Sequence, residues 1–210
     1  MVKGAVPNVK SLIEERSNLI SSIKNEGHKI IELEFPNELD GKNIHHDFVF
    51  IRDSFISDQK GKAIILRAGE PSRRIENNIV KKSLELLEIK IHEIPNRSGV
   101  RADGGEFYFC AQDKVLFSGL QRNTRSGVDF VAEELNVNEV VLLEGDGYHL
   151  DTFFTPALNK NGHIAALIIC EEILKPKSKK ALYNFSDHKS IPVFTIPVID
   201  AIGTKKQIGT

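Results

Sequence analysis

The chain has 210 residues, with 28 Lys or Arg against 29 Asp or Glu, so its formal net charge is −1 at pH 7. The 40% hydrophobic and 27% charged fractions indicate an ordinary globular chain of one large or two small domains. The balanced charge argues against broad nonspecific nucleic-acid binding. No apolar run approaches the roughly 18 residues of a membrane span or forms a secretory signal. The two cysteines, Cys110 and Cys170, exclude a disulfide scaffold and a four-cysteine zinc site, and a cytoplasmic location is the default prediction.

The first predicted elements are a helix over 9–26 and a strand over 29–33. Apolar residues recur on one face of this helix, and Gly27 follows it at the position where glycine commonly ends a helix. We interpret this segment as the tail of a repeating unit.

Three copies of a strand–turn–strand–helix–strand unit are predicted after it. In the first copy the strands cover 47–51, 63–66 and 89–94, and Ser72 is expected to cap the intervening helix. The other two copies contain six further strands, predicted over 106–110, 115–117, 139–143, 149–154, 164–169 and 191–196.

The helix of the second copy carries Val128, Val131 and Leu135, and that of the third covers 178–185, after a basic run at 175–180 that is expected to be a solvated loop. No further helix is expected after the third copy. The prediction is therefore one domain over 1–210, with a partial first unit, three full units and a shortened last unit. Such units bury their apolar faces only against neighbours.

Polar residues gather where each predicted unit begins, at 45–53, 101–106 and 144–152. If the units surround a common axis, these segments converge and bring together several carboxylates, a histidine and a few arginines. Carboxylates suit a guanidinium, whose N–H donors pair with them in a fixed fork. Arginines at the rim suit a carboxylate on the ligand, and a histidine can move protons near neutral pH.

Four motifs stand in order along the chain: Phe-Ile-Arg-Asp at 50–53, Arg-Ala-Gly-Glu-Pro-Ser-Arg-Arg at 67–74, Asp-Gly-Gly-Glu at 103–106 and His-Leu-Asp-Thr at 149–152. Together they resemble the pentein superfamily of guanidino-group-modifying enzymes. This superfamily includes dimethylarginine dimethylaminohydrolases, arginine deiminases and amidinotransferases. The resemblance covers roughly residues 30–200.

The resemblance implies an α/β propeller of ββαβ units with the active site on its axis. It implies attack of a cysteine thiolate on the guanidinium carbon, while a histidine protonates the leaving amine and then activates water. It implies no metal and no organic cofactor. The matching site residues are the catalytic His149 and Asp103, and the substrate-binding Asp47, Asp53, Asp151, Arg73 and Arg122.

Two features depart from the family pattern. The arginine loop usually reads Arg-Thr-Asn, but here Asn123 precedes Thr124, so Arg125 is an alternative to Arg122. The family nucleophile lies in the last unit, whereas no cysteine follows Cys170. Cys110 and Cys170 are both expected to be small buried apolar residues.

The leading hypothesis is an amidinohydrolase that acts on arginine or N-methylated arginine and gives citrulline plus an amine or ammonia. One alternative is a shortened, catalytically inactive paralogue that only binds guanidino compounds, and another is an amidinotransferase. A fourth interpretation is an interaction module that uses the exposed edge left by a missing unit, which would form homodimers or aggregate. His45 and His46 are interpreted as surface histidines and not as a pair of metal ligands, since neighbouring strand residues face opposite ways. Nucleic-acid and membrane partners are not expected.

Overall fold

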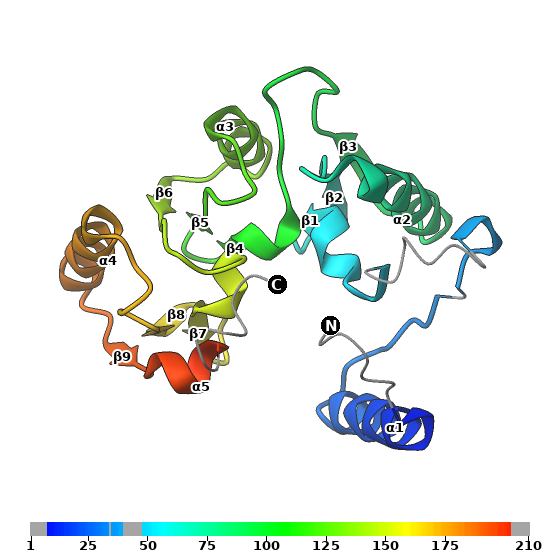
Figure 1. Ribbon diagram of the computed structural model, residues 1–210, viewed down its shortest axis with the longest axis horizontal. Coiled ribbons are helices and arrows are strands. Elements are labelled where there is room, and N and C mark those ends of the chain that lie inside the picture. The colour runs from blue at the N-terminus through cyan, green and yellow to red at the C-terminus, as the bar shows by residue number, and fades with distance from the viewer. Residues whose placement is uncertain (1–7, 34, 40–47, 203–210) are drawn as a thin grey trace. The chain divides into compact units, whose positions relative to one another are not determined.

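The computed structural model describes residues 8–33, 35–39 and 48–202 (Figure 1). The chain divides into two compact units, Met1–Asp40 and Gly41–Thr210. None of the helices in these described ranges is long and apolar enough to cross a membrane.

The first unit contains helix α1, Val9–Asn25, and the short 3-10 helix η1, Asn37–Leu39. The side chain of Asn8 accepts a hydrogen bond from the Ser11 N–H and caps the start of α1. Gly27 has φ of +83° just beyond the end, which confirms the predicted glycine stop. Residues 29–33 do not form the predicted strand, because no described strand pairs with them.

The second unit repeats one ββαβ arrangement three times, which confirms the predicted repeat. In each copy the first two strands are antiparallel and the third is parallel to the second. The first copy consists of β1 Phe55–Ser57, β2 Lys62–Ile65, α2 Arg74–Leu86 and β3 Lys90–Glu93. The second consists of β4 Phe107–Cys110, β5 Val115–Ser118, α3 Arg125–Glu134 and β6 Glu139–Leu142. The third consists of β7 Phe154–Leu158, β8 Ile164–Ile169, α4 Pro176–Lys189 and β9 Val193–Thr195.

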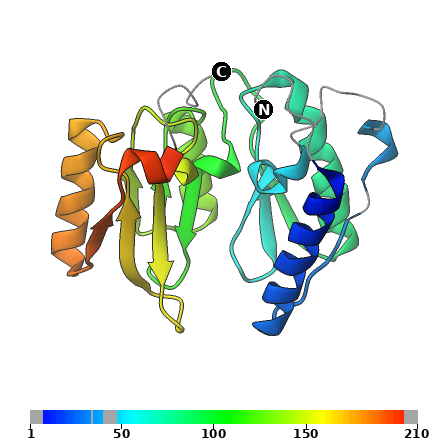
Figure 2. The ribbon, with the colours of Figure 1, turned by 60° about the horizontal axis from the view of Figure 1, so that its bottom comes forward.

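Two apolar clusters fill the spaces where neighbouring copies meet. Ile64 of the first copy packs in one cluster with Leu116 and Val128 of the second. Phe117 of the second copy packs in the other with Phe153 and Leu167 of the third. Figure 1 shows α2, α3 and α4 on the outer side of their strands, and Figure 2 shows β7 and β8 side by side along their length. Burying one such large apolar side chain contributes roughly 1.5–3 kcal/mol, so neighbouring copies stabilise one another.

The first strand of a copy begins later than predicted in two places. Residues 48–51 do not form a strand, because the 3-10 helix η3, Ile51–Ser54, precedes β1. Likewise η6, Leu150–Thr152, precedes β7, which begins only at Phe154. In the second copy η5, Gly104–Glu106, occupies the same place before β4. The apolar and aromatic composition of these segments favours a strand, but packing among the three turns overrides it.

Three smaller predictions are also wrong. Glu70, not Ser72, caps the helical turn η4, Pro71–Arg73, because its carboxylate accepts the Ser72 N–H. The basic run 175–180 is the start of α4 rather than a loop, since proline is well suited to a first helical position. A helix, α5 Val198–Ile202, follows β9, where none was expected.

Candidate functional site

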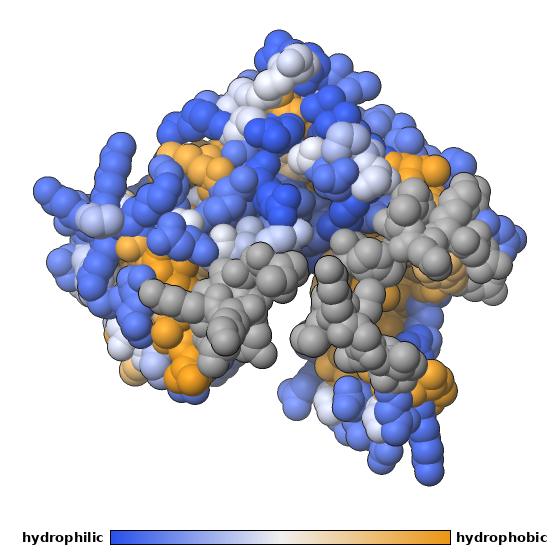
Figure 3. Space-filling view, in the orientation of Figure 1, coloured by the Kyte–Doolittle hydropathy of each residue, from blue (hydrophilic) through white to orange (hydrophobic). Residues whose placement is uncertain are grey.

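The turn η5 lies against both η3 and η6, and this packing brings the polar motifs together. Glycines allow this close approach. A Cβ at Gly104 would lie 1.9 Å from the Arg52 carbonyl oxygen, and one at Gly105 would lie 2.8 Å from Nδ1 of His149. Figure 3 shows hydrophilic residues in the middle of the view. The lack of side chains at residues 104 and 105 therefore allows the turns that bear the polar motifs to pack closely.

Asp53, Asp103 and His149 form the centre of the cluster. One oxygen of each carboxylate and one ring nitrogen of the histidine all lie within 4.8 Å of one another. Nε2 of His149 is 3.8 Å from Oδ2 of Asp103. All three side chains are buried, with 5–8% of each residue exposed. The structure thus brings together three residues from three different turns, as the sequence predicted.

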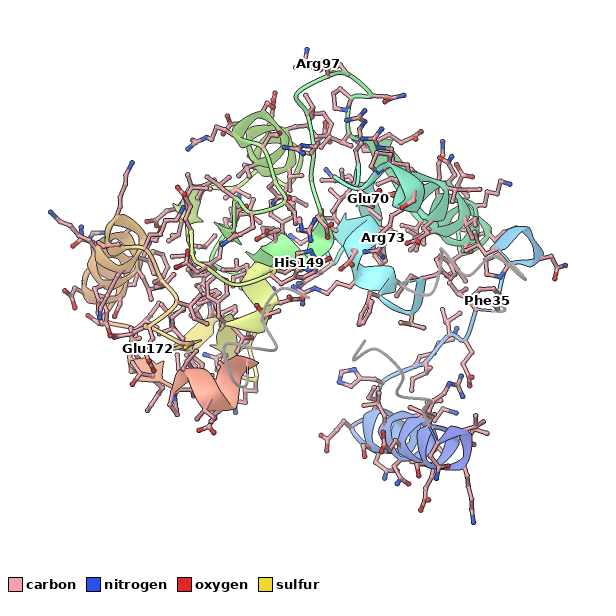
Figure 4. The ribbon with its side chains drawn as sticks, in the orientation of Figure 1. Phe35, Glu70, Arg73, Arg97, His149 and Glu172 are labelled. Carbon is pink, nitrogen blue, oxygen red and sulfur yellow. The ribbon has the colours of Figure 1, made fainter. Side chains whose placement is uncertain are left out.

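Arg73 binds the carboxylate of Asp53 directly. Its guanidinium lies 2.6 Å from Oδ2 of Asp53 and 2.9 Å from Oε2 of Glu76. Burial by itself would lower the pKa of Arg73, but the hydrogen bonds to these two carboxylates raise it overall. Arg73 therefore remains charged inside the site. Figure 4 shows it with His149 on the inner side of the second unit.

Arg52 makes a similar pair with Asp151. One guanidinium nitrogen lies 3.1 Å from Oδ2 of Asp151, and another donates to the Phe107 carbonyl at 2.7 Å. The guanidinium also lies 4.6 Å from the centroid of the Tyr108 ring. The sequence did not assign Arg52 a role, although it stands inside the motif at 50–53.

Arg122 and its alternative, Arg125, occupy different environments. The Arg122 guanidinium lies 4.3 Å from the centroid of the Tyr148 ring, which in turn contacts the His149 ring at 4.4 Å between centroids. Arg125 is exposed in the first turn of α3 and pairs with Asp129 at 2.8 Å. The structure therefore places Arg122, and not Arg125, beside the histidine.

Glu106 is a buried residue of the site for which the sequence predicted no separate role. Its two carboxylate oxygens accept the backbone N–H groups of Arg122 and Leu150, at 2.8 and 3.1 Å. The Asp-Gly-Gly-Glu motif contained this residue, but the sequence pattern placed it at the start of a strand. Nothing in that pattern reveals partners 16 and 44 residues away.

Burial perturbs the titration of the acidic groups and of the histidine in opposite directions. Burial, followed by the nearby Asp53 carboxylate, raises the pKa of Asp103 to about 7. Burial also raises the pKa of Glu106 to about 7, and it raises the pKa of Asp151 against the opposing effect of Arg52. Burial lowers the pKa of His149 to about 4. At neutral pH the imidazole is therefore uncharged and able to accept a proton.

The spacing of Asp53, Asp103 and His149 would admit a small cation. However, Arg73 already binds Asp53, and the charges of Arg73 and Arg122 both act on Asp103 and on His149. These positive charges disfavour a metal ion at the same point. The cation that the structure shows at Asp53 is an organic one, the guanidinium of Arg73.

The two cysteines lie outside this cluster, in the apolar core. Cys110 ends β4 and Cys170 follows β8, and both belong to the cluster between the second and third copies. They are 1% and 0% exposed, which confirms the predicted burial. Burial raises the pKa of the Cys110 thiol to about 12 and also raises the pKa of Cys170. Asp47 and the histidine pair at 45–46 fall outside the described residues.

Comparison with solved structures identifies the fold. The N-terminal domain of ArgZ, an arginine dihydrolase of the ornithine–ammonia cycle in cyanobacteria, matches with a TM-score of 0.72 at 21% identity. The match covers 92% of this chain and 66% of that domain. A dimethylarginine dimethylaminohydrolase matches with a TM-score of 0.68 at 19% identity, over 93% of this chain and 71% of that protein. The chain has the pentein fold.

The pentein fold of this chain is also found in AgrE, which was solved in complex with ornithine and NAD+. That match has a TM-score of 0.73 at 20% identity, over 93% of this chain and 27% of AgrE. ArgZ, AgrE and the dimethylaminohydrolase are pentein-superfamily enzymes that modify guanidino groups. This chain spans slightly less than two thirds of the ArgZ domain. No protein-family model matches it.

Proposed function

We propose that this site binds the guanidino group of arginine or of an N-methylated arginine. We further propose that it serves an amidinohydrolase reaction, which cleaves a guanidino C–N bond to give citrulline and ammonia or an amine. The observation that carries the proposal is that the carboxylates of the site already bind guanidinium groups of the chain itself. Arg73 lies 2.6 Å from Asp53, and Arg52 lies 3.1 Å from Asp151.

In this proposal, each residue of the site has a role that follows from its charge and position. Asp53 and Asp151 hold the guanidinium of the ligand. The ligand either displaces the guanidinium groups of Arg73 and Arg52 or binds beside them. Arg122 binds the carboxylate of the ligand, because its guanidinium makes no ion pair with any described residue and lies beside His149. Neutral His149 accepts and returns protons, and Asp103 lies near its Nε2.

A second candidate function, guanidino binding without turnover, is favoured by the position of the thiols. Covalent hydrolysis needs an activated nucleophile beside the guanidinium carbon. Cys110 and Cys170 are buried in the apolar core, and burial disfavours the thiolate form of both. The described residues therefore account for recognition and proton transfer, and the two candidates differ only in whether a nucleophile acts at the site.

The test combines calorimetric binding of L-arginine and of dimethylarginine with a citrulline assay. Binding with citrulline release supports the amidinohydrolase, and unchanged release by a Cys110→Ser, Cys170→Ser double variant would show that neither thiol is the nucleophile. Binding without release supports the second candidate. A folded chain that binds neither compound would refute both. His149→Ala is expected to abolish any release while the fold is retained.

A further inference from the structure

The Glu106 carboxylate joins the two segments that carry Arg122 and His149. Its Oε1 accepts the backbone N–H of Arg122 at 2.8 Å, and its Oε2 accepts that of Leu150, the residue after His149, at 3.1 Å. Glu106 has no exposed surface. Bulk water therefore does not reach these two N–H groups to replace the carboxylate, and a buried N–H without a partner is costly.

The surrounding backbone is shaped to receive this carboxylate. A Cβ at Gly119 would lie 1.7 Å from Oε2 of Glu106, so the lack of a side chain at residue 119 leaves the space that the carboxylate fills. The Gly119 N–H also donates to the Glu106 carbonyl at 2.9 Å. Both the backbone and the side chain of Glu106 thus hold the segment that leads to Arg122.

The two tethered segments also meet on their side-chain face. The Arg122 guanidinium lies over the Tyr148 ring, and this ring contacts the His149 ring. A shift of the Arg122 backbone would therefore change the distance between the guanidinium and the imidazole. That distance decides whether one ligand can reach both groups, with its carboxylate at Arg122 and its guanidino group near His149.

We infer that Glu106 is a positioning residue, which fixes the separation of Arg122 and His149 and so makes the site selective for guanidino compounds that also carry a carboxylate. This inference rests on the proposed function, because it takes Arg122 as the partner of the ligand carboxylate. Glu106 touches no ligand in this scheme, and it acts through the two backbone N–H groups that it accepts.

A glutamine at this position tests the role with little change of shape. Its amide oxygen can accept one of the two N–H groups, but its NH2 group then faces the other, donor against donor. Asp113→Asn is the matched control. Asp113 also links two copies, since its Oδ2 accepts the Ile164 N–H at 2.7 Å, but it lies in the β4–β5 turn at the other end of the strands from η5.

The experiment measures calorimetric affinities for L-arginine and for agmatine, which is arginine without its carboxylate. Glu106→Gln is expected to weaken L-arginine about tenfold, equivalent to about 1.4 kcal/mol, and to leave agmatine unchanged. Asp113→Asn is expected to change neither affinity. Equal losses for both ligands in Glu106→Gln would indicate a merely structural residue and overturn the inference, as would no loss for either.

Amide hydrogen exchange, followed by NMR, separates failure of this inference from failure of the proposed function. Glu106→Gln is expected to speed exchange at the Arg122 and Leu150 N–H groups and not at strands β7 and β8. If the parent chain binds neither ligand, the proposed function fails, and the inferred selectivity fails with it even where exchange confirms the tether. If Glu106→Gln does not fold, Glu106→Asp, which keeps the charge but is one methylene shorter, must show the same loss for L-arginine alone.

Discussion

Replacing Asp103 by Asn should stabilise the protein increasingly as the pH rises from 3.8 to about 7, while it weakens the site. Asp103 is 5% exposed, and burial together with the Asp53 carboxylate raises the pKa of its carboxyl from an ordinary 3.8 to about 7. Asn retains an oxygen that can accept the Gly105 N–H, as Oδ1 of Asp103 does at 3.4 Å. It cannot ionise. The substitution therefore removes the titration and keeps the local hydrogen bond.

The sign and size of this change in stability follow from the pKa of Asp103 in the unfolded and in the folded chain. Between pH 3.8 and about 7 the unfolded chain releases a proton that folded Asp103 retains, so the stability of the parent chain falls as the pH rises through this window. At 1.36 kcal/mol per pKa unit the full loss is about 4 kcal/mol above pH 7. This value is an upper bound, because water penetration and relaxation reduce such penalties. His149, with its lowered pKa of about 4, destabilises both proteins as the pH falls below 6.5, so its effect largely cancels in the difference.

Urea unfolding at pH 5, 6, 7 and 8 measures the difference in the free energy of unfolding between the variant and the parent. We expect Asp103→Asn to gain stability relative to the parent by up to about 1.4 kcal/mol for each pH unit between 5 and 7, and to level off above 7. Asp187→Asn, an exposed position on α4, controls for the change in net charge. A difference that is the same at pH 5 and pH 8 would refute the reasoning. Under the proposed function the variant should also bind L-arginine more weakly, because a neutral amide replaces one carboxylate of the cluster.

Three further predictions concern the core and the turns. Leu167→Ala, at a fully buried position in the cluster between the second and third copies, should cost about 2–5 kcal/mol in urea unfolding, and a loss under 1 kcal/mol would contradict the packing described. Gly104→Ala should destabilise by about 1–3 kcal/mol or more, because the new Cβ would meet the Arg52 carbonyl oxygen; an unchanged thermal midpoint would show that the turns do not pack this closely. Cys110 and Cys170 should not react with Ellman's reagent at pH 8 until the chain unfolds, given their burial and raised pKa values. Rapid labelling of the folded chain would place a thiol at the surface.

The repeat could be predicted from the sequence because its strands and helices follow short-range patterns of residue type. The apolar runs that became β2, β5 and β8 stand out by composition, and helical spacing of apolar residues located α2 and α3. The same patterns misplaced the starts of β1 and β7, where a β-favouring composition covers the turns η3 and η6. Local propensity is weak there compared with the packing of one turn on the next.

The sequence by itself determined the motifs that carry Asp53, Asp103 and His149, because the residue types and their order suffice to predict a guanidino-binding cluster. Only the tertiary structure decided which groups bind one another. Arg52 meets Asp151 across 99 residues, and Glu106 meets the Leu150 N–H across 44. Such pairs leave no periodic signal, because a hydrogen bond between distant segments depends on how the three ββαβ units pack and not on the spacing of residues along the chain.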